Sequence, residues 1–579
     1  MDIPEIRSIP YTRSDGIERV AKIIPVKLDL SHLSDNELQV IGNLAEAVNP
    51  IASIAAKQHH KKSKPLLRAA QNAERHARGK DKQRVDDYAT LVDAKGGPFD
   101  MYGYGHVLDV PFYLKRSFDG LEPLIGVGAR APPVKGYYPE DITEEEFASL
   151  EHGKEIENST VIRDYRANAF VVLNELRFRR ECASILHALE RAHSRAQEPS
   201  LNNYILAKID EIKSGAKELR VASDIAWIAN ASKIDFVLGT GIETYDDEFK
   251  SIRGVAQGAV YVENIEYASV VRKLRDMLPD WHNEVPWDKS KDGESRIPVL
   301  KFVDVVNWAG GYDMFPVVVS AECLPNDDEI VAKYGAVNVI FVNTQDARTQ
   351  DGVFDFTLQE FFTRDAAKYR DAMLSIDYTM TAAHELGHSQ TPIVPINDSK
   401  RLFGTDTHVL EEARAECYSL WALPRMVRAG MISEKEEIGG YYEMIRTCVE
   451  TLQKPPKDHS GSRNMMFHYY FADGAVKEVE EDGRTKYAID VARMRESNTT
   501  FLGHLGTFKA RLDADGFRVF KDRYVSTARQ QEFKKRMEAM PMGTSLLFPV
   551  MEKINGRFTG NLSYPASFRE QPRSLSRFL

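Results

Sequence analysis

The chain has 579 residues, enough for several folding units or for one large two-lobed enzyme. Its hydrophobic fraction of 43% and charged fraction of 28% are ordinary for a soluble globular protein. The formal net charge of −10 argues against nucleic acid as the main partner, because binding to phosphates needs a basic surface.

The sequence also argues against a membrane or secreted protein. It has no run of roughly 18 apolar residues, so we expect no membrane span. The N-terminus has no apolar segment behind a basic start, so we expect no secretory signal. The cysteines are far apart and form no CxxC pair, which predicts reduced thiols in a cytoplasmic protein. They are Cys182, Cys323, Cys417 and Cys448.

The N-terminal segments predict a strand followed by helices. Residues 17–30 have strand character, and Ser31 or Ser34 can cap a helical segment that follows. The basic stretch 59–84 predicts a solvated helix or loop. Its two leading histidines, His59 and His60, have no acidic neighbour in the sequence, and we expect them at the surface.

The middle of the chain changes character several times. Residues 95–140 are rich in Gly, Pro and Tyr and predict loops, and Asp141 or Thr143 can cap the helix that follows. Residues 161–230 predict long helices. Several β-branched runs ended by turn residues then predict strands between about residues 233 and 347, and the pattern becomes mostly helical again from Leu358.

The segment MTAAHELGHSQ contains an HExxH motif. His384 and His388 are spaced i, i+4 and therefore share one face of a helix, where both rings can bind one zinc ion. Glu385 can reach a water bound to that ion and act as a general base. Gly387 is a poor helix former, which suggests that another element comes close to the helix there. The motif alone can also occur by chance.

A second helix downstream, THVLEEARAECYSLWAL, supplies carboxylates. Glu411, Glu412 and Glu416 lie within two turns, and the last two share a face. One of them can complete a His, His, Glu metal site, and the others can hold the imidazole N–H groups. The alternative is a solvated acidic face paired with Arg414.

Together the motifs HELGH and EEARAE resemble those of the dipeptidyl peptidase III family of zinc aminopeptidases. The resemblance implies that Glu412 is the third zinc ligand, beside His384 and His388, and that Glu385 is the general base. It implies that Glu411 and Glu416 support the two histidines. The chain has the five-residue form of the first motif, as some bacterial members do.

Two further segments extend the resemblance. GTGIETYDDEF is similar to the family's G-x-I-E-x-Y segment, which implies that Glu243 binds the substrate's amino group and Tyr245 donates to the scissile carbonyl. DHSGSRNMMF has the family's H-x-x-x-R spacing, which implies that His459 stabilises the transition state with Arg463 beside it. Alternatively, Tyr245 is a packed strand aromatic and His459 is a surface histidine in a loop.

The segment AECLPNDDE departs from the family. It is similar to the family's N-x-P-N segment, in which two asparagines bind the substrate's amino end. Asn326 matches the second asparagine, whereas Cys323 stands in place of the first. A thiol is a weaker hydrogen-bonding group than an amide, and this weakens the case for recognition of a free N-terminus. We interpret Cys323 as a small buried residue and not as a nucleophile, because no paired base is evident.

The resemblance implies an α+β, two-lobed, dipeptidyl-peptidase-III-like fold with a wide cleft. A mostly helical zinc lobe is expected over residues 263–299 and 346–543. A mixed lobe with a β-barrel is expected over residues 1–262, with 300–345 and 544–579 returning to it. Closure of the lobes would exclude water from the reaction.

Three functions follow from this resemblance. The first is a cytoplasmic dipeptidyl peptidase with one Zn²⁺ per chain, acting on oligopeptides as a monomer or homodimer. The second is a family member with a non-peptide small-molecule substrate, such as an ester, amide or lactone, which Cys323 keeps open. The third is a binding protein without catalysis, which the intact Glu385 disfavours.

Overall fold

The structure is a computed structural model that describes residues 2–131, 134–150, 158–246, 249, 252–287, 299–311, 318–325, 327–390, 396–404, 406–540 and 543–579. The chain forms two compact units, each built from segments that are distant in the sequence. Unit 1 comprises Met1–Asn264, Phe302–Asp351 and Pro541–Leu579, and unit 2 comprises Ile265–Lys301 and Gly352–Met540. The predicted α+β class is confirmed, since both helices and sheets are present.

Unit 1 is centred on a five-stranded sheet with the strand order β5-β6-β7-β9-β8, which leaves β5 and β8 at its edges. The strands are β5 (Ile234–Asp246), β6 (Ile252–Glu263), β7 (Val299–Gly310), β8 (Ala321–Leu324) and β9 (Val337–Phe341). The long antiparallel pair β5 and β6 places Glu243 opposite Val255. A smaller sheet has the order β1-β2-β12, and β3 pairs with β4 and β13 with β14 as hairpins.

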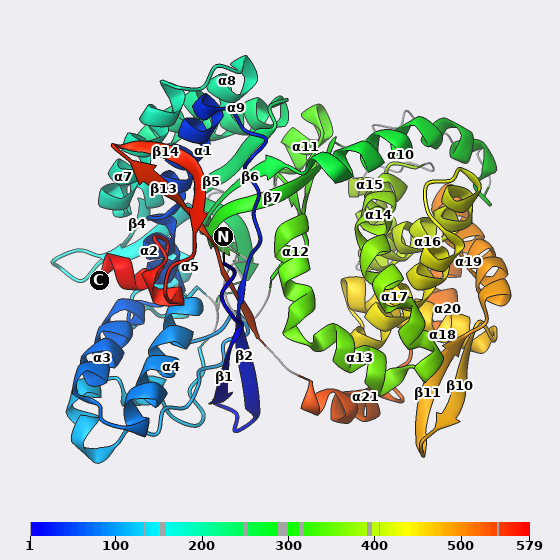
Figure 1. The fold of residues 1–579 in the computed structure, drawn as a ribbon, viewed down its shortest axis with the longest axis horizontal. Helices are drawn as coiled ribbons and strands as arrows, with labels where there is room; N and C mark the ends of the chain where they lie inside the picture. Colours follow the sequence, from blue (N-terminus) through cyan, green and yellow to red (C-terminus); the bar gives the residue numbers. More distant parts are fainter. Residues whose placement is uncertain are drawn as a thin grey trace. The chain divides into compact units, whose positions relative to one another are not determined.

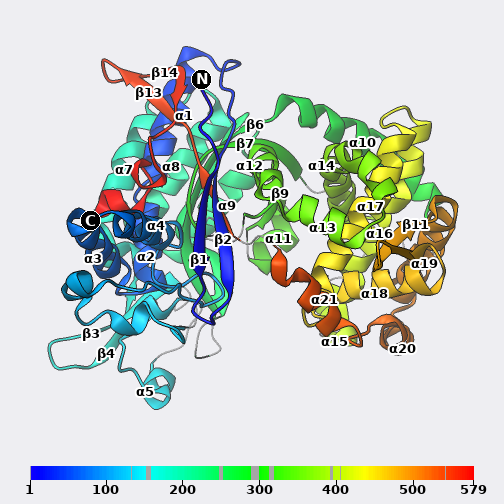
Figure 2. The same ribbon diagram turned by 60° about the horizontal axis from the view of Figure 1, so that its bottom comes forward.

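Helices cover the five-stranded sheet because their apolar faces match it. In α1 (Asp35–Val48), Ile41, Leu44 and Val48 are fully buried, and α1, α2 and α8 contact β5 or β6 (Figures 1 and 2). Each such side chain contributes about 1.5–3 kcal/mol when it leaves water. Gly258 on β6 permits the close approach, since a Cβ there would lie 3.1 Å from Ile51 and 3.2 Å from Val48.

The remaining elements of unit 1 surround this core. Its other helices are α2 (Ile51–His59), α3 (Ser63–His76), α4 (Lys80–Ala94), α5 (Glu144–Ser149), α6 (Asn174–Arg177), α7 (Arg179–His193), α8 (Pro199–Ser214), α9 (Lys217–Ile228), α11 (Asp328–Tyr334) and α12 (Val342–Arg348). Its other strands are β1 (Arg7–Thr12), β2 (Glu18–Pro25), β3 (Ser159–Arg163), β4 (Ala169–Leu173), β12 (Thr544–Leu547), β13 (Val550–Ile554) and β14 (Arg557–Ser563).

Some local predictions are confirmed and others are wrong. Ser34 caps α1 in a capping box with Glu37, and Thr143 caps α5 by accepting from the Glu146 amide. His59 is not at the surface: it is 4% exposed, and its Nε2 lies 2.8 Å from the carbonyl of Phe99. The run AFVVL is strand β4 and not the start of a helix, because it pairs with β3.

Unit 2 is mostly helical. Its helices are α10 (Ile265–Glu284), α13 (Val353–Phe361), α14 (Arg370–His388), α15 (Ile396–Phe403), α16 (Asp406–Arg428), α17 (Glu434–Thr451), α18 (Asp458–Ala472), α19 (Val491–Arg511), α20 (Ala514–Tyr524) and α21 (Gln530–Arg536). Its antiparallel hairpin consists of β10 (Val476–Glu481) and β11 (Arg484–Ile489). Helix α14 packs against both α16 and α17 (Figure 1).

Glycines allow these helices to pack closely. A Cβ on Gly387 of α14 would lie 3.0 Å from the ring of Tyr418 on α16, and this confirms that another element approaches the HExxH helix. A Cβ on Gly439 of α17 would lie 2.9 Å from the backbone of Ala372 on α14. Helix α14 is therefore held tightly on two sides.

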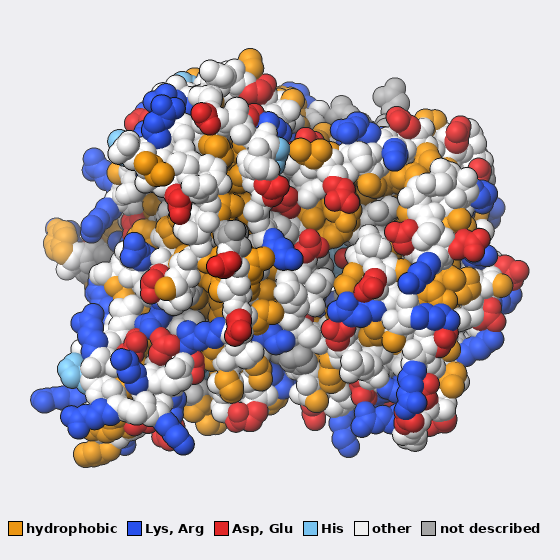
Figure 3. Space-filling view, viewed as in Figure 1, with side chains coloured by type: hydrophobic (Ala, Val, Ile, Leu, Met, Phe, Trp, Pro, Cys, Tyr) orange, Lys and Arg blue, Asp and Glu red, His pale blue; other side chains and the backbone are white. Residues whose placement is uncertain are grey.

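The surface carries both signs of charge. On the face in Figure 3, Lys and Arg side chains are interspersed with Asp and Glu side chains. Within the described segments, none of the helices combines the length and the apolar character needed to traverse a bilayer.

Candidate metal centre

The last turns of α14 present two histidines on one face. Apolar residues on the opposite face, among them Ala383 and Leu386, are fully buried and fix the helix in unit 2. The i, i+4 spacing brings the Nε2 atoms of His384 and His388 to 3.1 Å from one another. Both rings therefore direct the same nitrogen toward one point.

Glu412 on α16 approaches the same point. Its Oε2 lies 3.4 Å from Nε2 of His384 and 3.8 Å from Nε2 of His388. This buried oxygen accepts no hydrogen bond of ordinary geometry from a described residue. His384, His388 and Glu412 thus form a group that can hold a metal ion.

The spacing of these three atoms suits a tetrahedral ion. Zinc binds imidazole nitrogen and carboxylate oxygen at about 2.0–2.2 Å, which puts neighbouring ligand atoms about 3.3–3.6 Å apart. The observed separations of 3.1, 3.4 and 3.8 Å bracket that range. Two imidazoles and one carboxylate also leave a fourth position open, as in catalytic zinc sites. The residues present therefore fit the expected metal.

Glu411 orients His388 and is itself held by two cations. Nδ1 of His388 lies 3.0 Å from Oε1 of Glu411. Arg414, fully buried, donates to Glu411 at 2.5 Å, and Lys509 on α19 donates to its other oxygen at 2.6 Å. Hydrogen bonds of this kind fix the orientation and tautomer of a metal-binding histidine. The alternative of a solvated acidic face is wrong, because these partners are buried.

Glu416 and Arg463 form a second supporting pair. Arg463 on α18 donates to Oε1 of Glu416 through Nε at 3.0 Å and through a terminal nitrogen at 2.8 Å. The other oxygen of Glu416 lies 4.0 Å from Nδ1 of His384, a charge contact longer than a hydrogen bond. Three helices, α14, α16 and α18, thus contribute to the centre.

The centre is electrostatically prepared for a cation. Burial by itself would lower the pKa of His384, but Glu412, Glu416 and Glu385 raise it to about 9. Burial would raise the pKa of Glu412, but its contact with His384 and the charges of His384 and His388 lower it to about 2. The carboxylates hold their charge and attract a proton or a metal ion to the histidines.

The two other predicted residues of unit 2 lie beside this group. Glu385 is half-buried on α14 between the two histidines, and its charge acts on His384. Nδ1 of His459 lies 3.2 Å from Oε2 of Glu412, while its side chain is 60% exposed. His459 is in the first turn of α18, so the alternative that places it in a loop is wrong, whereas its exposure agrees with the surface position in that alternative.

The remaining predicted residues belong to unit 1. Glu243 is 5% exposed on β5, and Tyr245 follows it there with its hydroxyl donating to the carbonyl of Gly311 at 3.3 Å. Asn326 lies outside the described residues. Cys323 on β8 is exposed, so its interpretation as a buried residue is wrong.

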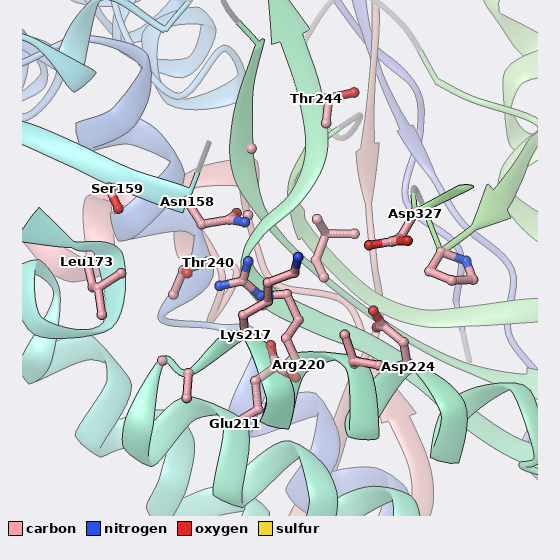
Figure 4. Close-up of a pocket in the computed structure, with 18 of the residues that line it drawn as sticks. Asn158, Ser159, Leu173, Glu211, Lys217, Arg220, Asp224, Thr240, Thr244 and Asp327 are labelled. Carbon is pink, nitrogen blue, oxygen red and sulfur yellow. The ribbon is translucent and has the colours of Figure 1, made fainter. Parts of the chain in front are cut away.

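Unit 1 also contains a cavity of about 970 Å³ that the sequence did not indicate (Figure 4). Its walls come from the β3–β4 hairpin, helices α8 and α9, strand β5 and the segment after β8. In the wall, the side-chain amide of Asn158 is oriented to make two hydrogen bonds. Its nitrogen donates to the carbonyl of Gly241 at 3.1 Å, and its oxygen accepts from Arg220. Burial raises the pKa of Asp224, also in the wall, to about 6.

Lys509 is the supporting residue that sequence reasoning missed. It is 98 residues from its partner Glu411, on a helix with no recognisable motif. Its role is evident because the Lys509 side chain is only 7% exposed and lies beside a carboxylate. The sequence does not reveal that a lysine is buried, since most lysines are exposed.

Comparisons with known proteins give a matching family and a similar fold. Residues 140–395 match peptidase family M49. The fold is similar to the structure of DPP III from Caldithrix abyssi, with a TM-score of 0.73 and 17% identity, covering 91% of this chain and 97% of that chain. It is also similar to dipeptidyl-peptidase III from Corallococcus sp. strain EGB, with a TM-score of 0.65 and 17% identity, covering 91% and 95%.

A curated relative is matched over part of its length. The Arabidopsis thaliana protein called Nudix hydrolase 3 is 22% identical over 379 residues. The match includes 63% of this chain and 47% of that protein, so the chain spans about half the length of this relative.

Proposed function

We propose that this protein is a zinc-dependent dipeptidyl peptidase. The proposal is supported by the match of residues 140–395 to peptidase family M49 and by the similarity of the fold to dipeptidyl peptidase III structures. The family resemblance predicted from the motifs is thereby confirmed. The finer proposal is that the protein removes dipeptides from the N-terminus of oligopeptides. The observation that carries it is the His384, His388 and Glu412 group with Glu385 on the same helix.

We propose that Nε2 of His384, Nε2 of His388 and Oε2 of Glu412 hold the zinc ion. Bound there, zinc supplies Lewis acidity toward the scissile carbonyl and the attacking water. Glu411 and Glu416 keep the two imidazoles oriented, and Arg463 keeps Glu416 ionised and in place. A rigid set of ligands of this kind favours one productive geometry.

Glu385 acts as the general base in this proposal. A carboxylate oxygen of Glu385 accepts a proton from the attacking water and later delivers it to the leaving amine. The hydroxyl of Tyr245 and the ring of His459 stabilise the negative charge that develops on the carbonyl oxygen. Glu243 and Asn326 bind the amino end of the substrate, and this contact sets the position of the cleaved bond.

The expected setting is the cytoplasm. No disulfide joins any of the four cysteines, which suits a reducing compartment. The substrates we propose are oligopeptides, and the protein acts as a monomer or homodimer. About half of the plant relative lies outside the match, so its name does not describe this chain.

The test is hydrolysis of Arg-Arg-naphthylamide by the purified protein with added zinc, beside the same compound N-acetylated. Cleavage of the free-amine form alone is the expected result. Equal cleavage of both forms would leave a peptidase without N-terminal specificity. No cleavage of either form by a protein that holds one zinc would favour the second candidate, a non-peptide substrate. The exposed Cys323 in place of the family's asparagine is the observation that keeps this candidate open.

A further inference from the structure

Another cavity of unit 1, of about 780 Å³, collects positively charged side chains from several separate segments. We call it the basic cavity. Its wall comes from the end of α2, the start of α3, the short 3-10 helix η3 (Lys135–Tyr137) with the segment after it, strand β3 and the junction of α6 and α7. Five cationic and two acidic residues line it, on a chain whose formal net charge is −10. They are Lys57, Lys61, Lys64, Arg163, Arg177, Glu140 and Asp141.

Close packing holds these segments together. Helix η3 contacts both α2 and β3, and α6 contacts β3. Gly136 allows η3 to lie directly on the end of α2, since a Cβ there would be 1.9 Å from the carbonyl oxygen of Lys57. Val161 and Phe178, which also line the cavity, are 2% and 3% exposed and belong to the core of unit 1. The basic cavity is therefore part of the packed fold.

Two of the five cations already have carboxylate partners. Lys57 forms an ion pair with Glu181. Arg163 binds Asp141 through Nε at 3.0 Å and Glu146 through a terminal nitrogen at 2.6 Å. These contacts compensate both cations, so neither calls for a further anion.

The other three cations lack such partners. Lys61, Lys64 and Arg177 form no ion pair with a carboxylate in the described part of the chain. Lys64 donates to a neutral group, the carbonyl oxygen of Phe578, at 2.9 Å. Glu140, exposed in the wall, acts on Lys61 through its charge without an ion pair. The cavity thus has three positive charges that its own carboxylates do not bind.

The environment of the two unpaired lysines disfavours their charge. Burial, together with the neighbouring charge of Lys57, lowers the pKa of Lys64 to about 8. Partial burial also lowers the pKa of Lys61. His60 in the same wall is neutral at pH 7, because burial lowers its pKa to about 4. An anion in the basic cavity would offset these costs, since it would give each ammonium group an ionised acceptor.

The number and kind of the unpaired cations suit a phosphate group. Two ammonium groups and a guanidinium can donate to several oxygens at once, and the planar guanidinium can bind two oxygens of one phosphate. A phosphate monoester carries about −1.5 to −2 charges at pH 7, more than a single carboxylate. The volume of about 780 Å³ is larger than a bare phosphate needs and is typical of small-molecule sites, which span about 300–1,000 Å³. An organic part can therefore lie against Val161 and Phe178.

We propose that the basic cavity binds a phosphate monoester of a small molecule, whose phosphate oxygens accept hydrogen bonds from Lys61, Lys64 and Arg177. None of the described residues proposed for zinc binding or catalysis is in its wall, so this site goes beyond the proposed peptidase function. The basic stretch 59–84, whose charge predicts a solvated surface, thereby gains a ligand at its start.

Calorimetric titration of the purified protein with AMP, inorganic phosphate and adenosine tests the proposal. We expect AMP to bind, inorganic phosphate to bind more weakly and adenosine to show no binding, because the phosphate carries the charge. In Lys61→Gln and in Arg177→Gln, Kd for AMP should rise about tenfold or more, as expected when one hydrogen bond between charged groups is lost. Both residues are exposed, so we expect the variants to fold.

Arg179→Gln is the matched control. Arg179 is exposed, lies two residues beyond Arg177 and is not in the wall, so Kd for AMP should not change. Equal Kd values for Lys61→Gln, Arg177→Gln and Arg179→Gln would overturn the proposal, as would the absence of binding to AMP and to phosphate. Binding is measured without a peptide substrate, so the result does not depend on whether the protein is a peptidase.

A second arm identifies the source of the phosphate group. Sedimentation with phosphatidylcholine vesicles is compared with and without phosphatidylinositol 4-phosphate. We expect no binding to either kind of vesicle. Binding to the phosphorylated lipid in place of AMP, weakened by Lys61→Gln, would overturn the small-molecule ligand and assign the basic cavity to a lipid headgroup.

Discussion

The metal centre of unit 2 and strand β8 of unit 1 both bury a glutamate, but with opposite electrostatics. Around the metal centre, Arg414 and Lys509 compensate Glu411, whose pKa lies well below its ordinary value, although burial acts to raise it. On β8 no ion pair from the described residues compensates Glu322, and burial with the neighbouring Glu243 raises its pKa. The same residue type is ionised in one place and favours its neutral form in the other.

This difference indicates that the metal centre, unlike Glu322, is prepared for a positive charge. The metal centre keeps its carboxylates charged before any ion arrives, because buried cations behind them offset the desolvation. Glu322 has no such cation among the described residues, and its burial therefore favours its neutral form. A resident ion suits the first arrangement, whereas Glu322 can stay buried by keeping its proton.

The largest expected effects come from Glu412, the proposed ligand, and Glu385, the proposed general base. Glu412→Ala should lose zinc, because one of three ligands is removed. Glu385→Gln should keep zinc but lower kcat on Arg-Arg-naphthylamide by about 10²–10⁴-fold, since it removes only the general base. Elemental analysis of the two purified variants, together with kcat, checks both expectations. A Glu412→Ala protein with its full zinc content would refute the ligand assignment.

A smaller effect is expected from the support behind the metal centre. Lys509→Met removes the cation that holds Glu411, and we expect zinc affinity to fall about 10–100-fold, the usual effect of losing an outer partner of a ligand. Competition with a chelator of known affinity measures the change. Arg495→Met is the matched control, since it breaks another ion pair of unit 2, with the buried Glu437, away from the centre. Equal zinc affinity in the two variants would contradict the role of Lys509.

Much of the metal centre could be predicted because its information is local. His384 and His388 are four residues apart on one helix, and Glu411, Glu412 and Glu416 lie within one later helix. Helical periodicity is enough to place the two histidines on one face of their helix and Glu412 with Glu416 on one face of the other. The partner Lys509 could not be found in this way, because its contact depends on how α19 packs against α16.

The strands of unit 1 show where sequence reasoning fails. The run AFVVL is short, apolar and followed directly by helical residues, and periodicity alone does not distinguish strand from helix in such a run. Its pairing with β3 decides the outcome. On β8, alternation puts Glu322 and Leu324 inside and Cys323 outside, so a carboxyl is buried while a thiol is exposed, against what the polarity of Glu322 and Cys323 suggests.

The opposite electrostatics of the two regions can be tested through pH. The pKa of Glu322 is about 8 in the folded protein, against an ordinary value of 4.5, so the folded state keeps a proton that the unfolded state loses. The natural protein therefore loses stability as pH rises from about 4.5 to 8, by up to about 1.4 kcal/mol per pH unit. Glu322→Gln does not titrate, and its advantage in Tm over the natural protein should grow from pH 5 to pH 8. The same Tm difference at both pH values would argue against a raised pKa.

The smallest expected effect concerns the rigidity of the metal centre. Gly387→Ala gains about 1 kcal/mol in helix propensity. The new Cβ, however, would lie 3.0–3.2 Å from the side chain of Tyr418, which is fully buried and packs against Trp421 with 5.4 Å between ring centroids. Overpacking of this kind costs about 1–3 kcal/mol, so the steric cost outweighs the gain and Tm should fall by a few degrees.

Calorimetry of the zinc-loaded protein measures that change, with Ser375→Ala as the control. Ser375 is exposed on the same helix, so the change to alanine adds helix propensity without a new contact, and Tm should not fall. Because His388 follows Gly387 directly, a helix displaced from Tyr418 should also bind zinc less tightly. A Gly387→Ala protein that is more stable than the natural one, with unchanged zinc affinity, would mean that α14 can shift freely.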